Sequence, residues 1–164
     1  MGHHITALIL KGNYNKEIAH TYDLAGKDIG FNLTLFHIDH YYSAYWQYKF
    51  ELKEYLKTAK TDYTIFPTEI ALAELMKKVS TTANFEFAII STDYFGGMGQ
   101  QFASVYENET LVSESITKIN QALAHLGVRR KNGLDEFDTV GLGDIRSQPD
   151  ILDKYYDLCE EHNL

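Results

Sequence analysis

Short runs of apolar and β-branched residues recur along the chain and predict five β-strands. Apolar residues fill positions 5–10, and over residues 31–38 they alternate with polar or small residues, as in a strand with one buried face. The predicted strands are residues 5–10, 31–38, 63–66, 85–92 and 101–107. The glycine-rich segment 93–99 joins the last two strands as a hairpin connection.

Four further segments have apolar residues at helical spacing and predict α-helices. The first covers residues 15–24, and Thr68 caps the second. Gly127 ends the third, and Ser147 caps the last, which has Pro149 in its first turn. The residues expected to face the core are Ile18 and Tyr22, then Leu72, Leu75, Met76 and Val79, then Ile116, Ile119, Leu123 and Leu126, and finally Ile151, Leu152, Tyr155 and Leu158.

Residues 39–57 carry two patterns at once. Apolar and polar residues alternate over residues 46–52, which favours a strand. Tyr41 and Tyr45 instead begin a series at helical spacing, and Asp39 suits an N-cap. No glycine, proline or asparagine interrupts the segment, so we interpret it as a helix and leave open that part of it is a strand.

Together these elements predict a single α+β domain over residues 1–164, with a mixed or antiparallel β-sheet packed with several α-helices. A chain of 164 residues buries roughly 70% of its unfolded surface, which is enough for a core of its own. The composition is 45% hydrophobic and 23% charged, as in ordinary folded proteins.

Several features bear on the compartment. Cys159 is the only cysteine, which excludes an internal disulfide and favours a reducing environment. Residues 5–10 are too short for a signal peptide, and no stretch approaches the roughly 20 apolar residues of a spanning helix. We therefore expect a cytoplasmic protein without membrane contact. His3 and His4 are typical of an expression-tag remnant and are left out of the candidate sites.

The negative charge of the chain is concentrated near one end. The net charge is −8, and residues 132–164 contribute −7 of it, with nine acids against Arg146 and Lys154. A phosphate backbone would be repelled there, and the one basic cluster is residues 129–131, so nucleic acid is not an expected partner. An acidic face favours a basic protein as partner, and an ordinary solvated surface remains the alternative.

Three features of the sequence resemble catalytic or ligand-binding motifs, but each has a simpler structural explanation. The glycines of residues 95–99 lead into a strand and not a helix, so they predict a turn and not a phosphate-binding loop. His37, Asp39 and His40 lack a third protein ligand, which favours a capping Asp beside two partly buried histidines over a metal site. Acidic neighbours make Cys159 a poor nucleophile. We therefore predict no catalytic, cofactor-binding or metal-binding residue.

Aromatic residues are unusually frequent, with 12 Tyr, 9 Phe and 1 Trp. Several of them crowd into residues 41–48, including Tyr45 and Trp46. Tyr and Trp are common anchors of protein interfaces, but a tyrosine-rich edge of the core explains the same pattern.

Three motifs resemble a group of small bacterial proteins that look like immunity proteins of toxin systems. They are the Tyr-Phe-Gly-Gly hairpin from Tyr94, the Ile-Asn-x-x-Leu helix from Ile119 and the Glu-Phe-Asp…Gly-Leu-Gly loop from Glu136. The resemblance covers roughly residues 89–147, about a third of the chain. It implies a bacterial, cytoplasmic protein with no established activity, in which the hairpin and the acidic loop pack together or form a binding face.

The predicted function is protein binding, most concretely immunity-type inhibition of a basic toxin through an acidic, aromatic-rich surface. The candidate surface residues are Tyr94, Phe95, Gln100, Asp135, Glu136, Asp138, Tyr45 and Trp46. The alternative hypothesis is a small-molecule-binding or enzymatic domain with its site near the 94–100 hairpin and the 135–138 loop. Self-association through the aromatic residues is compatible with both.

Overall fold

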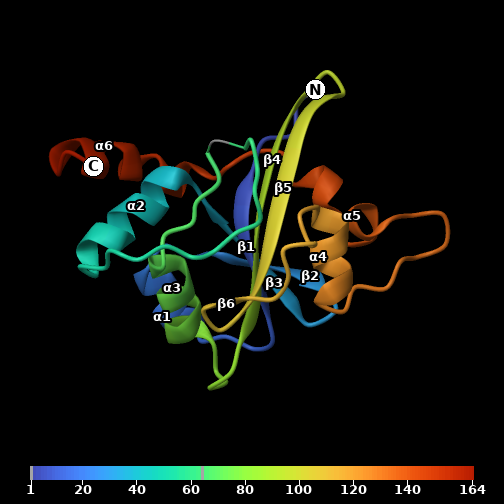
Figure 1. Cartoon of the computed structure of the whole chain (residues 1–164), viewed down its shortest axis with the longest axis horizontal. Coiled ribbons are helices and arrows are strands. Elements are labelled where there is room, and N and C mark those ends of the chain that lie inside the picture. Colours follow the sequence, from blue (N-terminus) through green and yellow to red (C-terminus); the bar gives the residue numbers. More distant parts are fainter. Residues whose placement is uncertain (1, 64) are drawn as a thin grey trace.

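One antiparallel β-sheet separates two groups of helices (Figure 1). The computed structural model describes residues 2–63 and 65–164, and within them the sheet has six strands in the order β2-β3-β1-β4-β5-β6. The strands are β1 (Thr6–Lys11), β2 (Gly26–Gly30), β3 (Leu33–Ile38), β4 (Glu86–Phe95), β5 (Met98–Glu107) and β6 (Thr110–Leu111). The predicted α+β class is confirmed, and every strand pairing is antiparallel.

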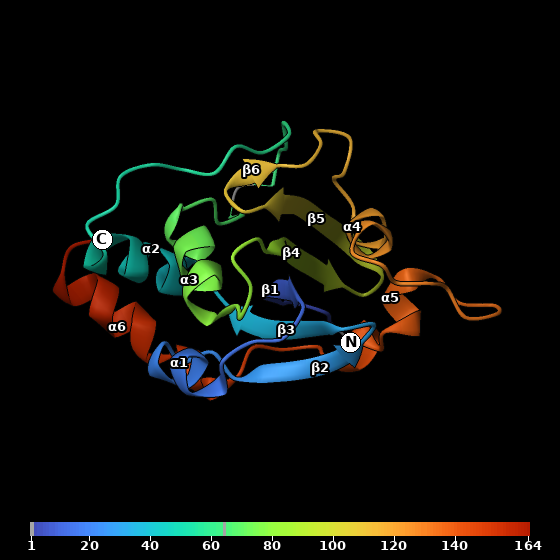
Figure 2. The ribbon, with the colours of Figure 1, turned by 90° about the horizontal axis from the view of Figure 1, so that it is seen from below.

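Helices cover both faces of the sheet, as Figure 2 shows. The face that we call the α2 face packs against α1 (Lys16–Thr21), α2 (His40–Lys49), α3 (Ala71–Val79) and α6 (Lys154–Glu161). The face that we call the α4 face packs against α4 (Ile119–His125), α5 (Glu136–Thr139) and the 3-10 turn Leu142–Asp144. In the part of the chain that the structure describes, no helix is long and apolar enough to cross a membrane.

The central strands are apolar on both sides because both sides are covered. Side chains alternate between the two faces of a strand, so Leu8 enters the core on the α2 face and Ile9 the core on the α4 face. Strand β4 repeats this division with Ile89 and Ile90. A strand buried on both faces must be apolar at nearly every position, which explains the continuous apolar run over residues 5–10.

Most predicted strands are confirmed, with shifted ends. The confirmed strands are those over residues 5–10, 85–92 and 101–107. Strands β4 and β5 extend beyond their predicted ends to Phe95 and Met98, so the hairpin connection is only two residues long. The strand predicted over residues 31–38 starts later, because Phe31 and Asn32 form a tight turn with positive φ. Strand β2 was not predicted, since it is an edge strand with a single buried residue.

The short strand predicted over residues 63–66 is wrong for its described residues, which belong to no strand; Thr64 lies outside the described residues. This segment crosses the α2 face above β4 and β5. Its aromatic side chains pack downward, with the ring of Phe66 edge-on to that of Phe102 at 4.7 Å. Tyr63 and Phe66 therefore contact the sheet without belonging to it, whereas Ile65 is exposed.

The helix predicted over residues 39–57 is confirmed for residues 40–49, which form α2, and is wrong for residues 50–57, which are not helical. Asp39 is its N-cap and accepts a hydrogen bond from the backbone N–H of Tyr42 at 2.7 Å. The helix ends at Lys49, and Glu51 then adopts a left-handed φ of 56°, which turns the chain away. The alternating residues that follow form no strand.

Two predicted helix caps are wrong. Helix α3 begins at Ala71 and not after Thr68, because the side-chain oxygen of Gln47 in α2 accepts the backbone N–H of Ala71 at 3.0 Å. Helix α6 begins after the 3-10 turn Asp150–Leu152, and Ser147 is not its cap. For α3, the hydrogen bond with Gln47 of α2 takes the place of a local cap. For α6, an additional 3-10 turn precedes the helix.

Inward-facing residues are predicted well for the longer helices and less well near short ones. Helix α4 is confirmed, with Gly127 at a φ of 108° just beyond its end. Ile18 and Ile151 are exposed, whereas Ala19 and Leu152 beside them are buried. Each residue of a helix is turned by about 100° from the previous one, so neighbouring residues face different sides and packing decides which of them is buried.

Burial of Tyr106 predicts a loss of stability in alkali. Burial raises the pKa of Tyr106 to about 12, and its hydroxyl donates a hydrogen bond to the carbonyl of Lys57 at 2.9 Å. An unfolded tyrosine has a pKa of about 10, so the folded chain keeps the proton longer and the free energy of unfolding falls as the pH rises from about 10 to about 12. Tyr106→Phe removes this titration. Urea unfolding followed by circular dichroism at increasing pH is expected to give a smaller alkaline loss for the variant. Equal losses would contradict the prediction.

Candidate functional site

The β4–β5 hairpin projects beyond the helices (Figure 1). Two apolar side chains, Phe95 and Met98, lie at its tip. Gly96 and Gly97 have φ of 60° and 80°, as in the two-residue turn that matches the twist of a hairpin. Phe95 and Met98 flank this turn and pair across the strands, and they are 82% and 79% exposed. Large apolar residues so exposed and so close together are characteristic of contact surfaces.

The two faces of the hairpin carry different residues. Because side chains alternate along the strands, Asp93, Phe95, Met98 and Gln100 lie on the α2 face. Tyr94 lies on the α4 face, where its hydroxyl accepts a hydrogen bond from the side chain of Gln101 at 3.2 Å. The candidate residues Tyr94 and Gln100 are therefore separated by the sheet, and Phe95 accompanies Gln100.

A cavity of about 310 Å³ lies at the base of the exposed hairpin, on the α2 face. Five separate parts of the chain form it: the start of β1, the N-terminus of α2, the loop residues Asp62, Tyr63 and Ile65, the β4–β5 hairpin, and Gln148. Its titratable lining residues include His4, His40, Asp39, Asp62, Asp93 and Tyr63. The three carboxylates meet only in the tertiary structure, since the nearest two are 23 residues apart in sequence.

Hydrogen bonds fix the floor of this cavity. The hydroxyl of Ser91 donates to the hydroxyl of Tyr63 at 2.9 Å and contacts the hydroxyl of Thr6 at 2.9 Å. At the rim, the ring of His4 lies 3.5 Å from a carboxylate oxygen of Asp93. Burial raises the pKa of Asp39, which is nevertheless hydrogen-bonded as the cap of α2. The floor is thus rigid and the rim is polar.

The three residues His37, Asp39 and His40 do not form a metal site. Asp39 and His40 line the cavity, whereas His37 points to the other side of β3 and pairs with the side chain of Gln148 at 2.8 Å. Burial lowers the pKa of His37, which favours its neutral form. Among the described residues there is no group of three or more His, Cys, Asp or Glu side chains placed to hold a metal.

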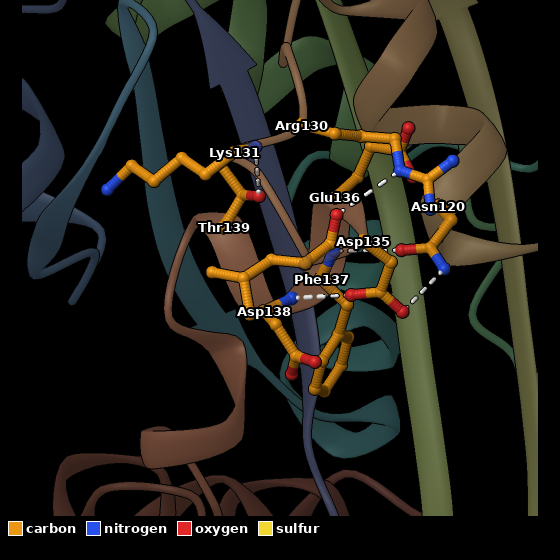
Figure 3. A network of polar contacts seen from close by, with 9 residues as sticks. Asn120, Arg130, Lys131, Asp135, Glu136, Phe137, Asp138 and Thr139 are labelled. Carbon is orange, nitrogen blue, oxygen red and sulfur yellow. Dashed lines mark hydrogen bonds and ion pairs between the residues drawn. The ribbon is translucent and has the colours of Figure 1, made fainter.

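The acidic segment 135–138 forms α5 against α4 on the far face of the sheet (Figure 3). One carboxylate oxygen of Asp135 accepts the backbone N–H of Asp138 at 2.8 Å, and the other accepts from the side chain of Asn120 at 3.1 Å. The side-chain oxygen of Asn120 in turn accepts the backbone N–H of Phe137 at 2.8 Å. The hydrogen bond from Asp138 lowers the pKa of Asp135. Asp135 therefore holds the loop against α4.

The other two acids of this segment differ in environment. Glu136 is largely buried and lies 3.9 Å from the guanidinium of Arg130, whereas Asp138 is exposed and points away from the network in Figure 3. The sheet separates this whole segment from the cavity beside Gln100. The structure thus brings Asp135 and Glu136 together as supports of the fold and leaves Asp138 at the surface.

His3 links the β4–β5 hairpin to the acidic segment, although its place near the N-terminus is typical of an expression-tag remnant. Its ring nitrogens lie 2.7 Å from the hydroxyl of Thr92 and 2.8 Å from the carbonyl of Leu142, and its ring packs 5.3 Å from that of Phe137. Its backbone also pairs with Tyr94. No local sequence signal distinguishes such a residue, because its partners are 89 and 139 positions away.

Tyr45 and Trp46 pack α2 against α6. The indole N–H of Trp46 donates to the hydroxyl of Tyr155 at 3.3 Å, and the rings of Tyr45 and Tyr155 are 5.4 Å apart. The hydroxyl of Tyr155 donates to Asp23, whose carboxylate also pairs with Lys154 at 2.7 Å. Both candidate aromatics therefore lie in a half-buried cluster, apart from the cavity.

No protein-family model matches this chain, and neither a curated protein nor a solved structure matches it. The function of this chain is therefore inferred from its own residues and their arrangement. Two features stand out from the rest of the surface: the exposed tip of the hairpin and the acid-lined cavity at its base.

The hairpin requires glycine at position 99. Gly99 has a φ of 156°, and a Cβ there would overlap the carbonyl oxygen of Asp93. We expect Gly99→Ala to separate the strand ends, with faster amide hydrogen exchange from residues 92–102 and unchanged exchange in β1. The control is Gly143→Ala, since a Cβ at Gly143 meets nothing within 4 Å. Equal exchange in the two variants would refute this account of the hairpin.

The cap formed by Asp135 predicts a difference between two substitutions. Asp135→Ala is expected to lower the free energy of unfolding by about 1 kcal/mol, the typical effect of losing an N-cap. Asp135→Asn keeps an oxygen acceptor and should lose much less. Because its pKa is lowered in the fold, the stabilisation by Asp135 is present above the ordinary pKa of Asp and is lost as the pH falls below it. Urea unfolding at neutral and acidic pH measures both effects; an Ala variant as stable as the Asn variant would exclude the cap.

Proposed function

We propose that this chain is a protein-binding domain of the immunity-inhibitor type, which uses the β4–β5 hairpin to bind a basic protein in the bacterial cytoplasm. The observation that carries the proposal is the pair Phe95 and Met98, exposed side by side at the tip of a projecting hairpin. The resemblance of the Tyr-Phe-Gly-Gly hairpin and its companion motifs to bacterial immunity proteins supports the same function.

The hairpin is suited to binding because it is ordered before a partner arrives. Ten residue pairs connect β4 to β5 without a register shift, so Phe95 and Met98 project from a fixed backbone. A preorganised surface loses less conformational entropy on association than a flexible loop. Burial of two large apolar side chains then provides the centre of an interface, where aromatic and Met residues are enriched.

Charge supports a basic partner. The whole chain has a net charge of −8, and Asp93 and Gln100 lie on the same side of the hairpin as the two apolar residues. Asp39 and Asp62 add two further carboxylates beside them in the cavity. Such a field accelerates encounter with a positively charged protein and disfavours nucleic acid.

The partner is sought first in the gene next to the one that encodes this chain, because the motifs resemble those of immunity proteins. We expect the purified neighbouring product to bind this chain at low salt, with an affinity that falls as ionic strength rises. Isothermal titration calorimetry measures both. A toxin-like neighbour that fails to bind at low salt, or a neighbouring operon of metabolic enzymes, would count against the proposal.

Two variants test whether the partner binds the hairpin in particular or any large exposed side chain. Phe95→Ala combined with Met98→Ala is expected to weaken partner binding at least about tenfold, because the substitutions remove central apolar contacts. Tyr55→Ala is the control, since Tyr55 is also a large, exposed side chain but lies outside the hairpin and outside the cavity lining. Unfolding curves should show that both proteins remain folded. Full affinity in the hairpin variant would exclude the hairpin as the binding surface.

A further inference from the structure

The cavity at the base of the hairpin is lined by acidic residues that are far apart in the sequence. Asp39, Asp62 and Asp93 lie on its walls, and among the described residues that line it there is no Lys or Arg. The pKa of Asp39 is raised by burial and further by the nearby charge of Asp153. A cation placed there would relieve the cost of keeping Asp39 ionised.

Its walls also suit the stem of a long cationic side chain. Tyr41, Tyr63 and Ile65 line the cavity together with the carboxylates, so aromatic and aliphatic surfaces lie beside the charges. Lys and Arg side chains bind in this manner, with their methylene groups on apolar surface and their charged heads at acceptors. Tyrosine faces attract a cation in addition.

The volume of the cavity and the chemistry of its lining residues restrict the kind of ligand that it can hold. A volume of about 310 Å³ is at the lower end of the range of roughly 300–1,000 Å³ for ligand sites, which suits one side chain better than a nucleotide. An anionic ligand would meet three carboxylates, and the only basic side chains among the described lining residues are His4 and His40, of which His4 already lies 3.5 Å from Asp93. A metal ion would require a ligand cluster that the described residues do not provide.

The cavity is continuous with the proposed contact surface. Asp93 lines it, and Phe95 is two residues further along the same face of β4. Two residues of a strand span about 7 Å, so a partner in contact with Phe95 and Met98 can place a neighbouring side chain in the cavity.

From this geometry we infer that the cavity is a binding site for an alkylammonium or alkylguanidinium group, supplied by a Lys or Arg side chain of the partner. The inference rests on the proposed function for the source of the cation. The site itself depends only on the residues of this chain.

The test of the site uses butylguanidinium chloride and butylammonium chloride as probes and butanol as the neutral counterpart. In ¹⁵N-labelled full-length protein, we expect the cations to give saturable shifts of the amide signals of His40, Asp93 and Gln100. Butanol should not shift these signals. An absence of saturable shifts, or equal shifts with butanol, would overturn the inference.

Two isosteric variants and a control test the carboxylates. Asp39→Asn keeps the cap of α2, and Asp93→Asn changes only a rim residue; each is expected to weaken probe binding about three- to tenfold. Asp138→Asn is the control, because Asp138 lies on α5, on the far face of the sheet. Unchanged probe affinity in both cavity variants would overturn the assignment of these carboxylates.

The same variants identify the source of the cation. Weaker binding of the partner by Asp39→Asn and Asp93→Asn supports a Lys or Arg side chain of the partner. Probe binding together with unchanged partner binding would overturn that source and assign the site to a free organic cation. Failure of the probes with intact, Phe95-dependent partner binding removes the cavity inference alone, and absence of any partner binding removes the proposed function.

Discussion

The rest of the structure depends on the uninterrupted pairing of β4 with β5. At one end of this hairpin Phe87 and Ile89 enter the core of the α2 face, and at the other end Asp93 and Phe95 lie outside it. The alternation of side chains is maintained along the whole hairpin, so the face that is buried at the base becomes the exposed face at the tip. The fold thereby orients the contact residues without any flexible connection.

Two sets of contacts hold this hairpin from opposite sides. On the α4 face, His3 joins Thr92 to the carbonyl of Leu142, and Asp135 anchors the following loop through Asn120. On the α2 face, the hydroxyl of Tyr106 donates a hydrogen bond to the carbonyl of Lys57, and the ring of Phe66 packs edge-on against that of Phe102. The exposed tip is consequently an extension of a rigid body, which is favourable for recognition of another protein.

The negative charge has a different role from the one its position in the sequence suggests. Within residues 132–164, Asp135 is a helix cap and Glu136 pairs with Arg130, so part of the excess stabilises the fold. Two of the three acids in the cavity at the base of the hairpin, Asp39 and Asp62, come from the N-terminal half, which is almost neutral overall. The distribution of charge along the sequence therefore does not show where acidic side chains meet in the folded chain.

The sequence alone determined the elements that local pattern controls. Alternating and continuous apolar runs predicted the central strands, helical spacing with Asp39 as cap predicted α2, and the glycines predicted the hairpin, since period and turn chemistry are local properties. These elements also defined the α+β class. The sequence also placed three of the candidate surface residues, Tyr94, Phe95 and Gln100, in the hairpin segment.

Only the tertiary structure decided what depends on contacts between distant residues. The role of His3 and the start of α3 at Ala71 each depend on partners far away in sequence. The same holds for the cavity, in which Asp39, Asp62 and Asp93 converge from three segments of unrelated local pattern. Local periodicity fixes which face of an element is apolar, but only packing decides which polar residues meet beyond the edge of the core.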